Sequence, residues 1–275
     1  MRVRLVVNPA SRRGSELDDA VGAELRRLGI EVVADQSPRG LDAIVVAGGD
    51  GTLAGEIPRA LAIGVPIGLV PLGTFNDLAR ALAIPLDVEG ACAVIAAEHT
   101  RPIDVARVSD AYYLTEASIG ISSRLARLQR PEDKQRFGFF AVVASLFYVV
   151  RYARTFRVEI ANDGKRERLK VVQLTIANSE HFGGVITVDD AAIDDGWLDC
   201  YCVAIDSFLD FLSVVGAMIR GRRHSVRGLR TFRARSFDVR TRRPHRITAD
   251  GEPAGTTPAR FEVLPRALRV FVPER

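Results

Sequence analysis

The segment Gly48-Gly49-Asp50-Gly51-Thr52 carries residue types that suit a phosphate site. It follows the apolar run 43–47 and precedes a helical pattern, so we expect it at the carboxyl end of a buried strand, where open α/β sheets collect ligands. Glycines there let backbone N–H groups close around phosphate oxygens, and the helix N-terminus adds a favourable field. The alternative is a tight strand–helix turn with Asp50 as the N-cap.

Asp50 is the informative residue of this loop. A carboxylate beside phosphate oxygens is repulsive unless a divalent cation or a transferable proton is also present, which indicates Mg²⁺-nucleotide chemistry. A second loop of the same form follows the apolar run 67–70 and contains Gly73, Thr74, Asn76 and Asp77. Capping explains one of these polar residues, but two Gly-and-Asp loops on successive strands are harder to explain as caps alone.

Asp104 follows Pro102-Ile103 and would be a third carboxylate at a similar height if residues 103–107 form a strand. A purely structural Asp at this position is an equally open interpretation. Other catalytic signatures are missing from the sequence: it has no G-x-x-x-x-G-K-[ST], no G-x-G-x-x-G after a strand, no H-E-x-x-H and no G-x-S-x-G. These absences exclude a P-loop enzyme and weaken a Rossmann dehydrogenase, a zinc peptidase and a serine hydrolase.

The elements that must position these loops are visible in the hydrophobic pattern. Continuous apolar runs at 5–7, 30–33, 43–47 and 67–70 are typical of parallel strands covered on both faces. Helical patterns lie at 15–28, after Thr52, after Asn76 and at 88–98, which together predict a doubly wound α/β nucleotide-binding domain over residues 1–105.

After residue 104 the pattern changes to short strands separated by turn signals. We expect strands at 156–161, 170–177, 198–204, 236–240, 246–249, 260–264 and 267–272, with helices at 138–154 and 208–220. The fold class is therefore α/β plus all-β, with an antiparallel β-sandwich domain over residues 106–275. In such a two-domain protein we expect the active site in the interdomain cleft.

The cysteine content and the apolar runs of the sequence indicate the cellular compartment. The chain has 275 residues, three Cys and a net charge of +4, and a lone C-x-C pair makes neither a disulfide framework nor a zinc site. The N-terminal apolar run is too short for a signal peptide, and the run 139–150 has about half of the roughly 20 residues that a spanning helix needs. We expect a soluble, cytoplasmic protein without a transmembrane segment.

With the loop from Pro71 to Asp77, the glycine loop resembles the diacylglycerol kinase/sphingosine kinase catalytic family in its short bacterial lipid kinase form. One glycine motif would be unspecific, since NAD kinases and phosphofructokinases also carry one, but the ordered set is specific. The resemblance spans almost the whole chain and includes Asn8-Pro9, Ile103-Asp104, Ala117-Ser118-Ile119-Gly120, Ala177-Asn178, Phe182-Gly183-Gly184, Asp194-Asp195-Gly196-Trp197-Leu198-Asp199, Ala249-Asp250-Gly251-Glu252, Thr257-Pro258 and Val272-Pro273.

The resemblance implies transfer of the γ-phosphate of ATP to a lipid hydroxyl, such as that of diacylglycerol or a long-chain base. The matched nucleotide-binding positions are Asn8, Pro9, Gly48, Gly49, Asp50, Gly51, Thr52, Gly73, Thr74, Asn76 and Asp77. By the same match, Asp50, Asp77 and Asp104 would hold Mg²⁺ through water. Asp250, Glu252 or Asp50 would be the base that takes the proton of the acceptor.

A second, structural Mg²⁺ site is implied at the Asp195 side chain with the backbone carbonyls near Ala192 and Trp197. Taken alone, Asp195-Gly196 would be a hairpin turn. The chain departs from the family pattern at three places, which would weaken contacts with the nucleotide. Residues 35–42 are too few for the usual helix, and Ser37 is the substitute there for a phosphate-binding Thr. Ala54-Gly55 replaces Asn-Glu, and Thr115 stands where Asn is common.

The charge is concentrated in one segment. From Arg220 to Arg246 there are eleven Arg and one Asp, a net +10, so the rest of the chain carries −6. This segment has two interpretations: a patch that docks on anionic membrane at the inner face, or a solvated sheet face, which the alternation of Arg233, Ala234 and Arg235 favours. Nucleic-acid binding is not expected, because a reading helix and an aromatic platform are missing.

Two other functions stay open from the sequence. One is a kinase of a soluble substrate, like an NAD kinase, and the other is a non-catalytic lipid- or nucleotide-sensing module.

Overall fold

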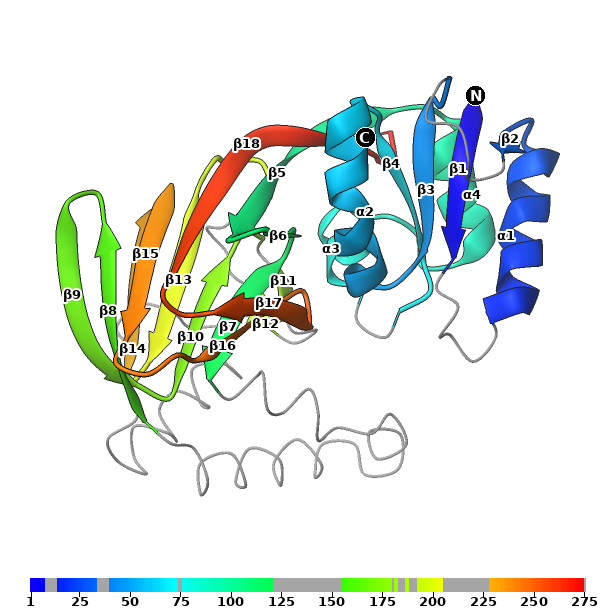
Figure 1. Cartoon of the computed structure of the whole chain (residues 1–275). Coiled ribbons are helices and arrows are strands. Elements are labelled where there is room, and N and C mark those ends of the chain that lie inside the picture. The colour runs from blue at the N-terminus through cyan, green and yellow to red at the C-terminus, as the bar shows by residue number, and fades with distance from the viewer. Residues whose placement is uncertain are drawn as a thin grey trace.

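The computed structural model describes residues 1–7, 14–33, 40–73, 76–120, 155–179, 181–182, 186–187, 192–204 and 228–274. The predicted helices at 138–154 and 208–220 lie outside these residues. So do Asn8, Pro9, Ser37 and Thr74. The described part forms an α/β half and a half of two packed sheets (Figure 1).

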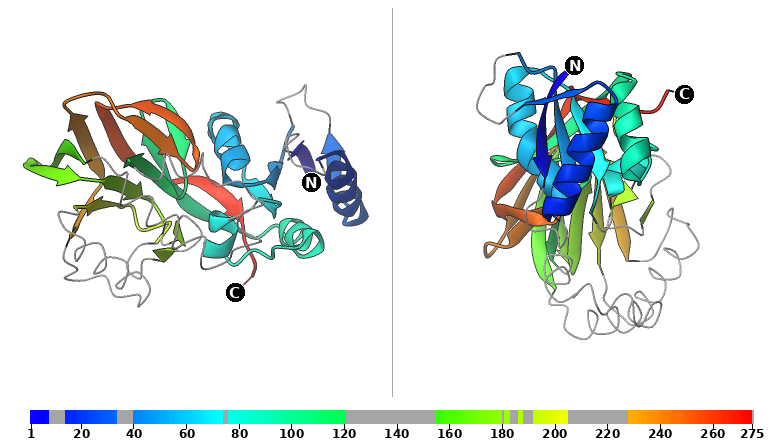
Figure 2. Two further views of the ribbon diagram at one scale, coloured as in Figure 1. Left: turned by 90° about the horizontal axis from the view of Figure 1, so that it is seen from below. Right: turned by 90° about the vertical axis from the view of Figure 1, so that its right-hand side faces the viewer.

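The α/β half has a parallel sheet in the order β2-β1-β3-β4. Figure 2 shows helices on both of its faces, with α2 on one side and α1 and α4, which contact each other, on the other. The predicted doubly wound arrangement is confirmed. Its elements are β1 (Arg2–Val7), α1 (Gly14–Arg27), β2 (Glu31–Val33), β3 (Ala43–Gly48), α2 (Asp50–Ile63), β4 (Ile67–Pro71), α3 (Asp77–Ala81) and α4 (Val88–Ala96).

The second half is a sandwich of antiparallel strands around its own apolar core, as predicted. One sheet has the order β14-β13-β10-β7-β16-β17, and β18, β15, β8, β9, β5 and β6 face it. The strands are β5 (Thr100–Val108), β6 (Ala111–Tyr113), β7 (Glu116–Gly120), β8 (Phe156–Asn162), β9 (Lys165–Val171), β10 (Gln173–Ala177), β11 (His181–Phe182), β12 (Ile186–Thr187), β13 (Leu198–Val203), β14 (Leu229–Ala234), β15 (Ser236–Thr241), β16 (Arg246–Ala249), β17 (Glu252–Thr256) and β18 (Ala259–Phe271).

Strand β18 belongs to both halves. Its first residues pair with β15 inside the sandwich, and Val270 pairs with Ile67 of β4, so one ten-stranded sheet runs through the molecule. Phe261 packs in the sandwich core, whereas Phe271 packs in the α/β core. The domain boundary between residues 105 and 106 stays a prediction. The structure shows in addition that the end of β18 packs in the α/β half.

Two predicted strand limits were wrong. Residues 170–177 hold the end of β9 and all of β10, with a break at Val172, while 260–264 and 267–272 form the single strand β18. Pro265 indicated a break in the sequence, but the ladder of β18 continues past it. The irregularity is a register shift, within which Arg266 has φ 52°. Strands β7 and β17 escaped prediction because Gly, Pro and small residues hide their alternation.

No helix in the described part of the chain is both long and apolar enough to cross a membrane.

The shared strand generates a stability prediction. Phe261 is fully buried, opposite Phe237 on one side and Val108 on the other. Phe261→Ala should lower the free energy of unfolding by about 3–5 kcal/mol, because it leaves a cavity between the sheets. Urea unfolding followed by circular dichroism measures this change. The neighbouring Arg260→Ala, which removes long ion pairs to Asp238 and Glu262 and a weak contact with Ser236 from an exposed side chain, should cost less than about 1 kcal/mol. Equal losses in both variants would contradict this account.

Candidate active site

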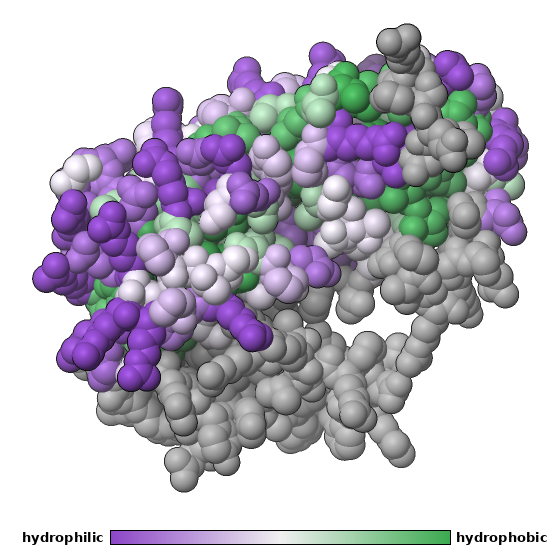
Figure 3. All heavy atoms as spheres, viewed as in Figure 1, coloured by the Kyte–Doolittle hydropathy of each residue, from purple (hydrophilic) through white to green (hydrophobic). Residues whose placement is uncertain are grey.

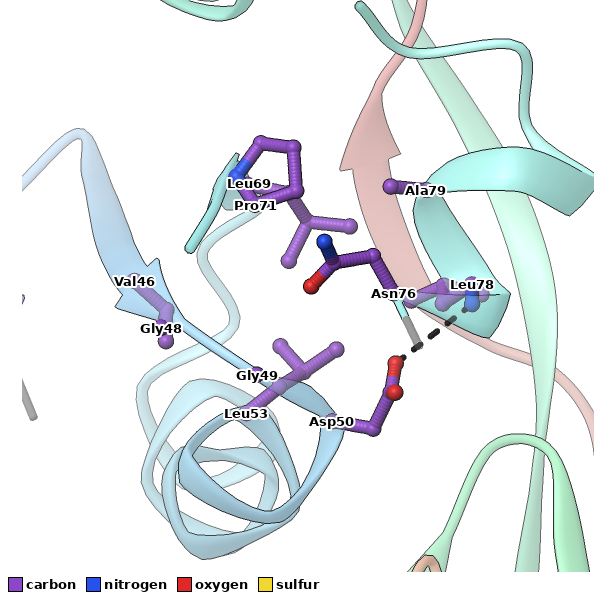
Figure 4. Close-up of a pocket in the computed structure, with 10 residues that line it drawn as sticks. All are labelled: Val46, Gly48, Gly49, Asp50, Leu53, Leu69, Pro71, Asn76, Leu78 and Ala79. Atoms are coloured by element: carbon purple, nitrogen blue, oxygen red, sulfur yellow. Dashed lines mark hydrogen bonds between the residues drawn. The ribbon is translucent and has the colours of Figure 1, made fainter. Parts of the chain in front are cut away.

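The two glycine loops lie side by side at the carboxyl edge of the parallel sheet. Gly48 ends β3 opposite Pro71, which ends β4, and the amide of Leu72 donates to the Gly48 carbonyl at 2.9 Å. Neighbouring parallel strands end at the same sheet edge, so the loops that follow them must meet. Of the predicted residues, Gly48, Gly49, Asp50 and Asn76 line one pocket (Figure 4). Gly73 approaches Gly49, and the Asp77 amide approaches Asp50.

The backbones of the two loops approach so closely that only glycine fits. A Cβ atom on Gly73 would lie 2.6 Å from the Cα of Gly49 and 2.7 Å from Oδ1 of Asn76. The Asn76 side chain closes its loop on itself, since its Oδ1 accepts from the Gly73 amide and its Nδ2 donates to the Gly73 carbonyl, both at 2.9 Å. The glycines therefore set the distance between the loops.

Asp50 is the first residue of α2, not its cap. The N-cap is Gly49, which provides no side-chain hydrogen bond to the first helical turn. The Asp50 carboxylate points across to the next loop, where the amides of Asp77 and Leu78 approach it at 3.3 and 3.5 Å (Figure 4). Asp50 therefore does not cap α2, and its carboxylate accepts instead from the first amides of α3.

The sandwich half brings Asp250 to the same region. Asp250 lies in the turn between β16 and β17, and its carboxylate accepts from the amides of Leu114, Thr115 and Glu116 at 2.8–3.0 Å and from the Thr115 hydroxyl. Burial raises the pKa of Asp250 to about 6, although these hydrogen bonds oppose the rise. Because four donors use its oxygens, Asp250 holds the strand start at 114–116 in place.

Glu252 is placed differently. It is exposed at the start of β17, and a Cβ atom on Gly51 would lie 3.0 Å from its Oε1. The Glu252 carboxylate therefore faces the glycine loop from the other half of the molecule, across the predicted interdomain cleft.

Glu116 is a residue that the sequence analysis missed. It starts β7, and burial raises its pKa to about 7, with further contributions from the charges of Asp250 and Asp77. A raised pKa between two other acids is typical of functional sites and of structural clusters alike. The available signal in the sequence was its position next to Thr115 and the motif 117–120 of the resemblance.

Asp104 is not brought to this cluster. It is fully buried on β5, where its oxygens accept from the amides of Gly196 at 2.6 Å and Arg266 at 2.7 Å. Burial raises its pKa, as do the charges of Asp195 and Asp194. Asp104 therefore ties the turn before β13 to the bulge of β18.

The predicted structural metal set lies in that turn. The Asp195 carboxylate accepts from the amides of Ala192 at 3.2 Å and Trp197 at 2.9 Å, and it pairs with the Arg233 guanidinium. Within the residues that the structure describes, no group of three or more His, Cys, Asp or Glu side chains could hold a metal ion.

The glycine contact predicts a matched pair of substitutions. Gly73→Ala should destabilise the fold by about 1–3 kcal/mol, since neither Gly49 nor Asn76 can yield without opening the loops. Gly55→Ala on α2 has open space and should stabilise by about 0.5–1 kcal/mol through helix propensity. Chemical denaturation of both variants tests the pair, and a neutral Gly73→Ala would refute the close approach.

The acid cluster predicts a pH dependence. Folding raises the pKa of Glu116 from 4.5 to about 7 and that of Asp250 from 3.8 to about 6, so the folded chain binds more protons between about pH 4 and 7. Stability must then fall as pH rises through this window. Glu116→Gln should remove on the order of 2 kcal/mol of that fall. Urea midpoints from pH 5 to 8 measure it, and the exposed Glu98→Gln should keep the wild-type slope.

Two family models match the chain. The model described as "Diacylglycerol kinase catalytic domain" matches residues 19–108, and "YegS C-terminal NAD kinase beta sandwich-like domain" matches residues 117–272, more than half of the chain. The order of the two models agrees with the order of the α/β and sandwich halves.

Several curated relatives match over nearly the full length. A diacylglycerol kinase of Mycobacterium tuberculosis is 28% identical over 99% of this chain and 95% of its own, and one of Staphylococcus aureus is 26% identical over 99% and 92%. An uncharacterized protein of Synechocystis is 29% identical over 84% of this chain, which spans about half (54%) of that relative.

A crystal structure from Bacillus anthracis has the same fold, with a TM-score of 0.81 at 23% identity over 99% of this chain and 95% of that one. The chain belongs to the bacterial diacylglycerol kinase-like family, with a diacylglycerol kinase catalytic domain followed by the YegS-type sandwich.

Proposed function

We propose that this protein is a lipid kinase that transfers the γ-phosphate of ATP to a lipid hydroxyl, with diacylglycerol as the first candidate acceptor. Diacylglycerol kinases, after which its relatives are named, are phosphotransferases that act on an alcohol group. The observation that carries the proposal is the meeting of Glu252 with Gly51: a carboxylate of the sandwich half faces the glycine loop at the N-terminus of α2.

The glycine loops suit a nucleotide phosphate. The first turn of α2 has no side-chain cap, so its N-terminal dipole would favour an anion there, although the Thr52 amide already donates to the Gly49 carbonyl at 3.1 Å. Gly48, Gly49, Gly51, Thr52, Gly73 and Asn76 would bind the phosphate chain, with Asn8, Pro9 and Thr74 contributing from outside the described residues.

The same cleft has ligands for Mg²⁺. This ion binds proteins through one or two carboxylates and keeps water and phosphate oxygens as its other ligands. Asp50 and Asp77 fit that demand, because the Asp50 carboxylate lies against the Asp77 amide at the loop edge. A bound Mg²⁺ would neutralise phosphate charge. The carboxylate of Asp104 is fully buried and binds the amides of Gly196 and Arg266, so it is left out of this proposed set.

Glu252 is the base that we favour. A base needs a free lone pair that can reach the acceptor hydroxyl, and the exposed Glu252 side chain meets this need, whereas Asp250 accepts four hydrogen bonds. In a loose transition state the hydroxyl loses its proton late, so a weak carboxylate base suffices. Asp250 then positions β7 and Glu116 at the floor of the cleft.

Membrane docking by the segment 220–246 finds little support in its described part. Arg233 points outward from β14 opposite Asp199, while Arg240 points outward from β15 opposite Glu159. These strands lie in the two facing sheets, so the two arginines are on opposite faces of the sandwich. Figure 3 shows hydrophilic side chains spread over the end of the sandwich where β8 and β9 lie. We propose only that the lipid reaches the cleft at a membrane surface; Arg233 and Arg240, from the described part of this segment, do not share one face.

Two substitutions test the proposed roles. Asp50→Asn and Glu252→Gln should each lower kcat by at least about 100-fold, because they remove a phosphate-site carboxylate and the base. Transfer of labelled phosphate from ATP to diacylglycerol in mixed micelles measures it, with the exposed Glu167→Gln as a control of wild-type rate. Glu252→Gln should keep the wild-type melting temperature, whereas Asp250→Asn should lower it.

The acceptor is decided in the same assay by replacing diacylglycerol with a long-chain base, ceramide, a prenyl alcohol or NAD. Phosphorylation of NAD alone would replace the lipid proposal with a soluble-substrate kinase. If no acceptor is phosphorylated while ATP still binds, the protein is a sensing module.

A further inference from the structure

Arg233 lies where the family resemblance implies a structural Mg²⁺. It is on β14, and the β13–β14 register sets it opposite Asp199 on the outer face of the sheet. From there its Nη2 donates to Oδ2 of Asp195, and its Nε lies 3.9 Å from Oδ1 of Asp199. The strand register therefore fixes Arg233 beside Asp199, and the turn before β13 places Asp195 on the other side of the same guanidinium.

The Asp195 carboxylate has little left to offer a metal. Its Oδ1 accepts from the Trp197 amide, and its Oδ2 accepts from both the Ala192 amide and Arg233. The Ala192 carbonyl, one of the implied ligands, already accepts from the Asp195 amide at 3.4 Å. Mg²⁺ demands a nearly regular octahedron and gives up water reluctantly, so a carboxylate that already accepts three hydrogen bonds, one of them from a guanidinium, suits it poorly.

Two arginines offset part of the local negative charge. Asp194 pairs with Arg101 at 2.5 Å, while Asp195 of the turn and Asp199 of β13 share Arg233. A divalent ion beside Asp195 would lie next to the Arg233 guanidinium, where like charges repel strongly at a partly buried site. The residues present therefore do not fit the implied ion.

A second arginine supports the same turn. The guanidinium carbon of Arg235 lies 5.3 Å from the ring centroid of Trp197, within the range of a cation–π contact. The turn carries the Gly196 amide that binds the buried Asp104, so holding the turn also holds the link between β5 and the bulge of β18.

We propose that Arg233 is the resident cation of the turn 192–197 and replaces the structural Mg²⁺ that the family resemblance implies. Arg233 and Arg235 are then structural arginines, which accounts for two charges of the basic segment that the proposed kinase activity does not use. The proposal is independent of that activity and of the acceptor.

Metal binding and melting of the full chain test it. Mn²⁺, read by electron paramagnetic resonance, serves as the probe for wild type and Asp195→Asn, so that ions bound at Asp50 or Asp77 cancel in the comparison. Melting temperatures in EDTA are compared for Arg233→Ala and Arg230→Ala, the latter being an exposed arginine on the same strand.

The proposal expects equal Mn²⁺ stoichiometry in wild type and Asp195→Asn. It also expects Arg233→Ala to melt about 2–4 °C below Arg230→Ala, because two partly buried carboxylates lose their partner. Loss of one Mn²⁺ equivalent in Asp195→Asn would overturn it, as would identical melting of the two arginine variants. The Mn²⁺ comparison remains decisive even if Arg233→Ala does not fold.

Discussion

The continuity of strand β18 is the constraint on which the active-site geometry depends. The ladder of β18 continues past the register shift at Leu264–Leu268, so its pairing with β15, β5 and β4 fixes the sandwich relative to the α/β half. Both apolar cores also include residues of this strand, Phe261 in one and Phe271 in the other. The turn that carries Glu252 is thereby held against the glycine loop at Gly51.

Within this frame the carboxylates divide into two kinds. Asp104 and Asp250 accept hydrogen bonds from backbone amides of distant segments, which offsets the cost of burying them and ties strands together. Asp50 and Glu252 reach the edge of the cleft from opposite halves. The fully buried Asp104 and the four-times hydrogen-bonded Asp250 hold segments together, whereas Asp50 and the exposed Glu252 are the proposed phosphate-site carboxylate and base. Glu116 lies between the two groups, with a pKa near neutrality.

The arginines follow a similar rule. In the sequence they form one dense segment, but strand alternation and the two-sheet arrangement distribute them over different faces. Arg233 has two carboxylates and Arg235 an aromatic ring as partners, and these contacts concern the turn 192–197 rather than a membrane. A run of like charge along a chain is thus a poor guide to a surface patch when the run crosses several strands.

The sequence by itself determined the order of the elements, the two halves and the glycine loops, because buried parallel strands and Gly-Asp turns are local patterns. It also indicated both Asp50 and the Asp250–Glu252 pair. It could not show that Asp250 accepts four hydrogen bonds while Glu252 is exposed, find Glu116 or the pairing of Arg233 with Asp195, or identify the two amides that Asp104 binds. Those depend on which backbone amides and charges, more than a hundred residues away for Asp250, come within hydrogen-bond distance. Only the tertiary structure decides that, because a side chain's chemistry is set by its neighbours in space.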